Sequence, residues 1–138
     1  MYLSYEEYQN MGGTLEEAAF NDLEFQAECE VDWYTFNRLR NETELPNALK
    51  RCVYSLIKLI NEQQQAYVVN PLDSNGNIQA GIASQSNDGV STSFNTLSAQ
   101  SAAELIKAKI EDTIKKQLAS VTNSLGRKVL YRGLYPGE

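Results

Sequence analysis

Apolar side chains recur every three or four residues in three separate stretches of this chain, and this spacing limits the fold more than any other feature. On an α-helix such spacing forms one apolar stripe, which must be buried against another element. The stripes consist of Leu15, Ala19, Leu23, Ala27, Val31 and Tyr34; of Leu49, Cys52, Val53, Leu56, Ile57 and Ile60; and of Ile106, Ile110, Ile114, Leu118 and Val121. We therefore expect a mainly α-helical bundle of three to four helices, with the middle stripe at the centre of its core.

Short polar motifs mark where the first two helices should begin and end. Residues 4–7 and 14–17 each fit a capping box, in which a Ser or Thr and a Glu three positions later cap the first turn. The pair Gly12-Gly13 favours the end of a first short helix. The second helix should then open at the second box and run to about Phe36.

The later helices have weaker but consistent boundary signals. Pro46 lacks a backbone N–H and suits the first turn of a helix, which we expect to continue to about Gln65. The last helix should start near Ser98 or Ser101 and stop at the polar turn that contains Gly126. Additional aromatic residues broaden the second stripe, so we expect that helix to touch more than one neighbour. They are Phe20, Phe25, Trp33 and Phe36.

Residues 70–101 interrupt the helical pattern with many Ser, Asn, Gln and Gly and with only Asp73 and Asp88 as charges. Apolar and polar residues alternate on both sides of residues 87–89, which predicts a projecting β-hairpin at about residues 78–95. A three-residue loop with Gly89 in the left-handed conformation would keep the larger apolar side chains on one face. The hairpin residues expected to contact other proteins are Ile82, Ser84, Ser86, Asn87, Asp88, Gly89, Val90, Thr92 and Phe94.

The sequence divides into a helical domain at residues 1–126, which carries the hairpin, and an extended C-terminal arm at residues 127–138. The arm also alternates, which is typical of a short strand, and spare strand edges are commonly used to bind partners. An uncharged projection can dock on another protein without burying charge. The arm residues expected to make such contacts are Val129, Leu130, Tyr131, Arg132, Leu134 and Tyr135.

The chain lacks the residues on which several classes of function usually depend. The chain has no His, which removes the commonest general base, and no CxxC pair that would indicate zinc. Its two cysteines, Cys29 and Cys52, are expected to be small buried hydrophobes. The acidic start does not resemble a signal peptide, and no apolar run could span a bilayer. We therefore expect a soluble protein made in the cytosol, without enzymatic activity, cofactor or metal.

Charge is distributed unevenly along the chain. Residues 1–44 carry eleven acids and two bases, a balance of −9, whereas the remaining residues carry ten bases and seven acids, a balance of +3, which together give the net charge of −6. Two interpretations stay open. The charges can simply keep helix faces solvated, or one end of a subunit can attract the other end of its neighbour and favour a head-to-tail ring.

Stretches along nearly the whole chain resemble the head–tail connector (adaptor) proteins of tailed bacteriophages and prophages. They are "YEEYQNMGG", "TLEEAAFNDLEFQAECEVDWYTFNRL", "LPNALKRCVYSLIKLI", "ASQSNDGVSTSF" and "VLYRGLYPGE". The serine-rich "SNDGVS" segment and the closing "VLYRG" are the most specific parts.

This resemblance implies a structural protein of the virion neck, between capsid and tail, that is assembled in the bacterial cytoplasm. It implies a homo-oligomeric ring of about twelve copies beneath the portal protein, which extends the DNA channel without binding DNA specifically. Residues 129–135 would face the portal, and residues 84–94 would contact other neck subunits, including a downstream tail-completion protein. The alternative from another class is a small intracellular binding or regulatory protein whose hairpin holds one partner.

Overall fold

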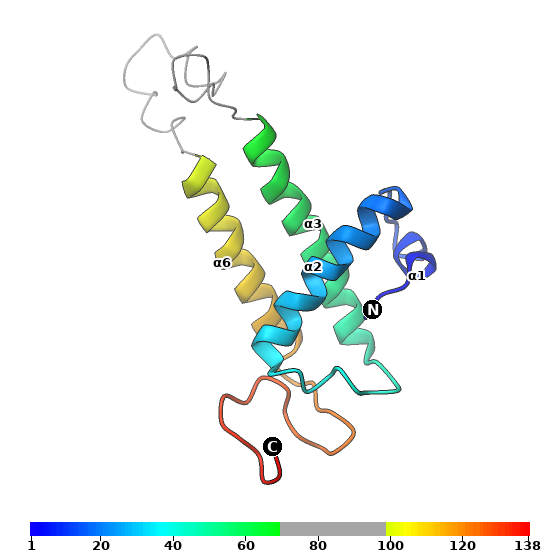
Figure 1. Cartoon of the computed structure of the whole chain (residues 1–138), viewed down its shortest axis with the longest axis vertical. Coiled ribbons are helices and arrows are strands. Elements are labelled where there is room, and N and C mark those ends of the chain that lie inside the picture. The colour runs from blue at the N-terminus through cyan, green and yellow to red at the C-terminus, as the bar shows by residue number, and fades with distance from the viewer. Residues whose placement is uncertain (70–98) are drawn as a thin grey trace.

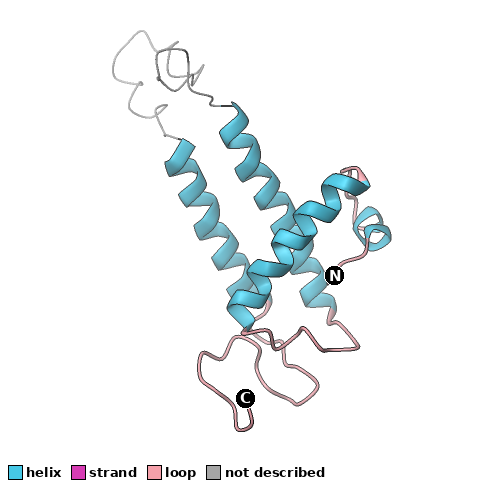
Figure 2. Ribbon diagram, viewed as in Figure 1, coloured by secondary structure: helices cyan, strands magenta, loops and turns pink. Residues whose placement is uncertain are grey.

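The computed structural model describes residues 1–69 and 99–138, and in these two ranges the chain is mainly helical. The helices are α1 Tyr5–Asn10, α2 Glu17–Thr35, α3 Asn47–Val69 and α6 Ala99–Gln117. No residue of the described ranges belongs to a strand (Figure 2). The expected helical fold class is therefore confirmed, whereas the predicted hairpin at residues 78–95 lies outside the described residues. None of the described helices is long and apolar enough to cross a membrane.

Helix α3 lies at the centre of the fold, with α6 beside it and α2 crossing it (Figure 1). The central position follows from its composition, because every residue of the predicted middle stripe is buried. The last predicted stripe is buried as well, although α6 ends at Gln117, before the predicted stop. Ile110 and Ile114 on α6 and Leu118 and Val121 after it are buried, and Ile106 packs partly buried against the same core. Helix α1 and the N-terminus lie against α2. One apolar core thus holds all the described helices together.

The predicted capping box at residues 4–7 is confirmed. The backbone N–H of Glu7 donates to the Ser4 hydroxyl at 3.1 Å, and the N–H of Ser4 donates to the Glu7 carboxylate at 3.0 Å. The second predicted box, at residues 14–17, is wrong, because α2 begins only at Glu17 and its N-cap Glu16 makes no side-chain capping bond.

Two tyrosines of α1 explain this later start. The Leu15 N–H donates to the Tyr8 hydroxyl at 3.2 Å, and the Tyr5 hydroxyl donates to the Leu15 carbonyl at 3.0 Å. The Leu15 carbonyl, which would accept an intrahelical bond in a helix beginning at residue 14, accepts from Tyr5 instead. The buried face also shifts: Phe20, packed 4.8 Å from the Tyr8 ring, is buried, and Ala19 is exposed.

The C-terminal arm does not form the expected short strand. Only one isolated antiparallel bridge, between Thr122 and Lys128, occurs in the described part of the chain. The reason is that four arm carbonyls, at residues 128, 129, 131 and 133, accept hydrogen bonds from the Arg38 guanidinium. Carbonyls that all point toward one side chain cannot also accept the backbone hydrogen bonds of a neighbouring strand. The arm therefore curls against the end of α2 (Figure 1).

Candidate partner-binding surface

Helix α2 and its C-cap carry a second apolar stripe, on the face opposite the core. Its members are spaced by four, four and three residues, so they lie in line on a helix. We call this set, Phe25, Cys29, Trp33 and Phe36, the outer stripe. The exposed fractions of its three aromatic residues are 65% for Phe25, 76% for Trp33 and 52% for Phe36. The core face of the same helix is filled by Leu23, Ala27 and Val31 instead.

The outer stripe corrects two expectations from the sequence. Phe25, Trp33 and Phe36 do not pack on neighbouring helices within the subunit, and Cys29 is exposed rather than buried. Only Cys52 is a buried thiol, and burial raises its pKa to about 12. The stripe could be missed because α2 has apolar residues at helical spacing on both faces, so periodicity alone does not say which face enters the core. An exposed row of aromatic residues is typical of a protein interface.

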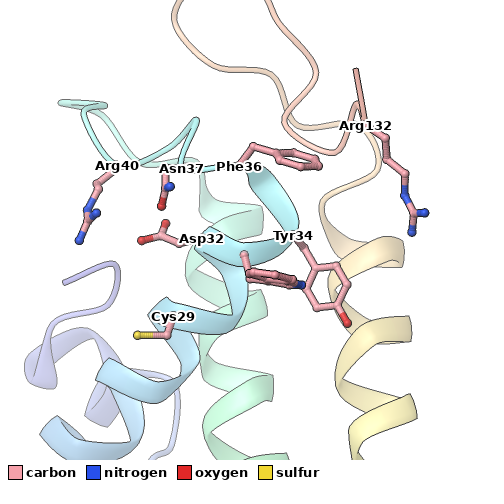
Figure 3. A pocket seen from close by; sticks show the side chains of 8 residues that line it. Cys29, Asp32, Tyr34, Phe36, Asn37, Arg40 and Arg132 are labelled. Carbon is pink, nitrogen blue, oxygen red and sulfur yellow. The ribbon is translucent and has the colours of Figure 1, made fainter. Parts of the chain in front are cut away.

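A groove of about 650 Å³ occupies the C-terminal half of this surface (Figure 3). It is formed by α2, the turn after α2 and the C-terminal arm. The lining residues are Cys29, Asp32, Trp33, Tyr34, Phe36, Asn37, Arg40 and Arg132. In Figure 3, Asp32 and Arg40 lie on one side of the groove and Arg132 lies on the other. The groove thus has an aromatic floor with charges at its margins, which suits a polypeptide with both apolar and charged side chains.

No group of three or more Cys, Asp or Glu side chains is arranged to hold a metal ion within residues 1–69 and 99–138. The shifted pKa values near the groove have structural causes. For Tyr34, partial burial and the Glu111 carboxylate raise the pKa of the phenol.

The backbone turns sharply at the end of the outer stripe. Phe36 and Asn37 both adopt the left-handed conformation, with φ of 53° and 59°. Their N–H groups both donate to the Asp32 carbonyl, which closes the end of α2. Asn is often found in this conformation, but for an aromatic residue it costs about 1 kcal/mol or more. This turn places the Phe36 ring at the surface and brings Arg38 underneath it.

Arg38 attaches the arm to the end of α2, and its side chain is only 3% exposed. Its guanidinium donates to four carbonyls of the arm, including those of Val129 at 3.1 Å and Gly133 at 2.6 Å. Its Nε and Nη2 atoms also donate to the two carboxylate oxygens of Glu138, at 3.0 and 3.2 Å. Every N–H direction of the guanidinium thus meets an arm acceptor, so the arm is held by one buried cation.

Aromatic rings surround the same guanidinium. Its central carbon lies 5.2 Å from the centre of the Phe36 ring, 5.9 Å from that of Tyr131 and 4.9 Å from that of Tyr135. These are cation–π distances. Phe36 belongs to the outer stripe and lies over Arg38, which also binds the arm, so the outer stripe and the arm form one continuous surface.

The predicted arm residues divide into two groups. Val129 is fully buried and Leu130 packs partly buried against the core, so in this conformation both serve the fold. Tyr131 and Arg132 are exposed, Leu134 has an exposed fraction of 81%, and Tyr135 is half-buried against Arg38. The predicted hairpin residues lie within residues 70–98, outside the described part of the chain.

Acidic side chains border the outer stripe. Residues 17–35 contain six acids and no base. Three of these acids are occupied by the N-terminal segment: Glu24 accepts from the Tyr2 and Leu3 amides, Glu28 pairs with the amino group of Met1, and Asp32 accepts from the Tyr2 hydroxyl. Asp22 and Glu30 have no cationic partner among the described residues. The surface is therefore aromatic along its middle and negative along α2, with Arg40 and Arg132 at the margins of the groove.

Comparisons with protein-family models, with curated proteins and with solved structures give no match for this chain. A function therefore has to be inferred from the residues of the chain and their geometry.

Proposed function

We propose that this chain is a structural head–tail connector of a tailed phage or prophage particle. In this proposal it forms a homo-oligomeric ring beneath the portal, extends the DNA channel and joins head to tail. The observation that supports it best is the outer stripe, a row of aromatic side chains that one subunit leaves in solvent. A subunit that works by assembling with others needs such a surface, and an isolated monomer does not.

The arm supplies a second surface for this role. Tyr131 and Leu134 are exposed apolar residues on a loop that Arg38 attaches firmly to the bundle. A loop fixed in this way loses little conformational entropy when it binds, which favours affinity. We assign the arm to the portal, and the predicted hairpin at residues 78–95 to neighbouring neck subunits and a downstream tail-completion protein. These two assignments follow the resemblance by position.

The charge of the chain fits passage of DNA through the ring. With a net charge of −6, an assembled ring offers DNA few cationic contacts that would hold the phosphate backbone. Specific DNA binding is therefore not part of the proposed role. The groove beside Trp33 favours protein partners as well, because its floor is aromatic and its described residues form no metal cluster.

Binding to purified portal rings of the same phage tests the proposal. Leu134→Asp places a charge on the exposed arm and should weaken portal binding by about tenfold or more. The matched control is Leu125→Asp, at another exposed leucine in the turn before the arm, which should bind like the original chain. Failure of the unaltered chain to bind portal rings would exclude the connector role and favour the small binding protein. Equal effects of both substitutions would exclude the arm as the portal contact.

A further inference from the structure

We infer that two copies of this chain pair through their outer stripes with the two α2 helices antiparallel, so that each groove beside Trp33 receives the N-terminal half of α2 of the other copy. The inference goes beyond the connector role, because a two-fold contact closes after two copies and does not build a ring. The dimer is the form of the chain off the particle, in which the exposed aromatic row is covered.

The outer stripe has the same spacing when it is read from either end. Cys29 is four residues from Phe25 and from Trp33, and these positions share one face of α2. When two copies lie antiparallel about Cys29, Phe25 of each copy therefore lies against Trp33 of the other. The two small Cys29 side chains meet at the centre, where they let the helices approach closely.

The two ends of this surface carry opposite charges. At the N-terminal end, Glu17 and Asp22 are exposed, and neither forms an ion pair with a described residue. At the C-terminal end, Arg40 and Arg132 lie on either side of the groove (Figure 3), and they also form no ion pair with a described residue. The acid of the groove, Asp32, already accepts a hydrogen bond from the N-terminal segment.

These charges select the antiparallel direction. In a parallel two-fold pair the acidic ends would face each other and so would the arginines, which is unfavourable. In the antiparallel pair, Asp22 of each copy comes to the groove of the other copy, where Arg40 and Arg132 lack partners. A second copy fits the groove because its α2 supplies both an apolar row and the acids that the groove lacks.

Two glutamates lie near the centre of the stripe, and neither opposes the contact. Glu28 and Glu30 are the sequence neighbours of Cys29, so each is turned from it by about 100° around the helix. Both therefore project along the sides of the contact, where they stay near water and repel weakly. Glu28 is also paired with the N-terminal amino group at 2.9 Å.

Disulfide formation at Cys29 tests the contact in the full chain, without the portal. Cys29 is exposed and Cys52 is buried, so oxidation by dissolved oxygen with a copper–phenanthroline catalyst acts on Cys29. We expect a disulfide-linked dimer on non-reducing electrophoresis, because the contact brings the two Cys29 side chains within bonding reach. Sedimentation of the reduced chain at submillimolar concentration should show monomer and dimer and no larger species.

A chain with its cysteine moved along the stripe is the matched control. Ala18→Cys combined with Cys29→Ser places the thiol at an exposed position near the start of α2. In the antiparallel dimer the two residues at position 18 lie about 33 Å apart along the helices, so this variant should not form the link. In a parallel pair it would form the link as readily as the original chain.

Charge reversal provides a second arm of the test. Asp22→Lys should weaken self-association by about fivefold or more, and so should the combined Arg40→Glu and Arg132→Glu variant. The triple variant restores opposite charges and should recover most of the original affinity. Arg51→Glu, at an exposed position on α3, should leave self-association unchanged.

Four outcomes would each overturn the inference: a chain that stays monomeric, association beyond the dimer, linkage of the Ala18→Cys variant as fast as that of Cys29, or a triple variant no better than its parents. The first would leave the outer stripe to a different protein. None of them touches the connector role, because binding to the portal is measured separately. A chain that dimerises as described but fails on the portal would lose the connector role and keep the dimer.

Discussion

Arg38 and Glu138 are 100 residues apart in the sequence and meet side chain to side chain, with Nε to Oε1 at 3.0 Å and Nη2 to Oε2 at 3.2 Å. This fork-to-fork pair closes a loop of chain around a guanidinium that is already bonded to arm carbonyls. The exposed Leu134 of the arm therefore owes its position to an arginine at the end of α2.

Replacing Arg38 should release the arm. Arg38→Ala leaves several arm carbonyls without a donor, and the free energy of unfolding should fall by about 2–4 kcal/mol. Arg38→Lys keeps the charge but loses the planar fork, so its loss should be smaller and still measurable. Urea denaturation measures both. An Arg38→Ala variant as stable as the original chain would show that the arm contributes nothing to the fold.

Acid should loosen the arm before it unfolds the bundle. The Arg38 guanidinium holds the pKa of the Glu138 carboxyl below its usual range. A carboxyl with a lowered pKa in the folded state contributes stability above its ordinary pKa of about 4.3, and this contribution is lost as the pH falls through the lowered value. Amide signals of Tyr131 and Gly133 should therefore shift as the pH falls below about 4. Glu138→Gln is the control, because it should remove this pH response at the arm, and a response that persists in this variant would contradict the mechanism.

The sequence predicted the core best where only one face of a helix is apolar. The α3 stripe from Leu49 to Ile60 and the last stripe, from Ile110 on α6 to Val121 after it, are buried as expected. The core face of α2 was harder to predict. Phe25 and Trp33 recur at helical spacing on one face, and Leu23 and Ala27 recur at helical spacing on the other. Which face enters the core depends on how α1 fixes the start of α2 through Leu15, a contact between elements that periodicity does not encode.

The site was harder to predict than the core. The alternation at Val129 and Tyr131 indicated a strand, but the arm carbonyls bond to Arg38, which is more than ninety residues away in the sequence. Nothing local marks Arg38 as their donor, so a pattern within the arm could not find it. Leu134 and Tyr131 are exposed. Their role in partner contacts and the hairpin at residues 78–95 both stay predictions.

Substitutions on the two faces of α2 should separate stability from assembly. Trp33→Ser removes an exposed ring, so the free energy of unfolding should stay within about 0.5 kcal/mol while self-association weakens. Leu23→Ser, on the core face of the same helix, should lower the free energy of unfolding by about 3 kcal/mol. Thermal denaturation and sedimentation measure the two effects. Destabilisation by Trp33→Ser as large as that by Leu23→Ser would mean that the outer stripe belongs to the core.

Glu24 should make the chain less stable at neutral pH than at mildly acidic pH. Its side chain is 2% exposed and accepts from the Tyr2 and Leu3 amides at 2.7 and 3.2 Å, and burial raises the pKa of its carboxyl. A raised pKa contributes stability that is full below the ordinary value of about 4.3 and is lost as the pH rises through the raised value.

Two variants of Glu24 test this reasoning. Glu24→Gln keeps an oxygen acceptor without the charge, so it should be at least as stable as the original chain at pH 7. In mild acid, where the Glu24 carboxyl is itself neutral, the variant should no longer be the more stable of the two. Glu24→Ala leaves both amides without an acceptor and should lower the free energy of unfolding by about 1–3 kcal/mol at either pH. Equal loss in both variants at pH 7 would show that the carboxylate itself is needed.

Thr35 offers a substitution that should stabilise the chain. It is fully buried at the end of α2, and its hydroxyl has no hydrogen-bond partner among the described residues. A buried hydroxyl without a partner carries a desolvation penalty, and Thr35→Val removes that hydroxyl while keeping the branched shape. The free energy of unfolding should therefore rise by about 1 kcal/mol. Urea denaturation at pH 7 measures the change, with Thr35→Ser as the control that keeps the hydroxyl and loses a methyl group. If Thr35→Val is the less stable of the two, the hydroxyl has a partner in the folded protein.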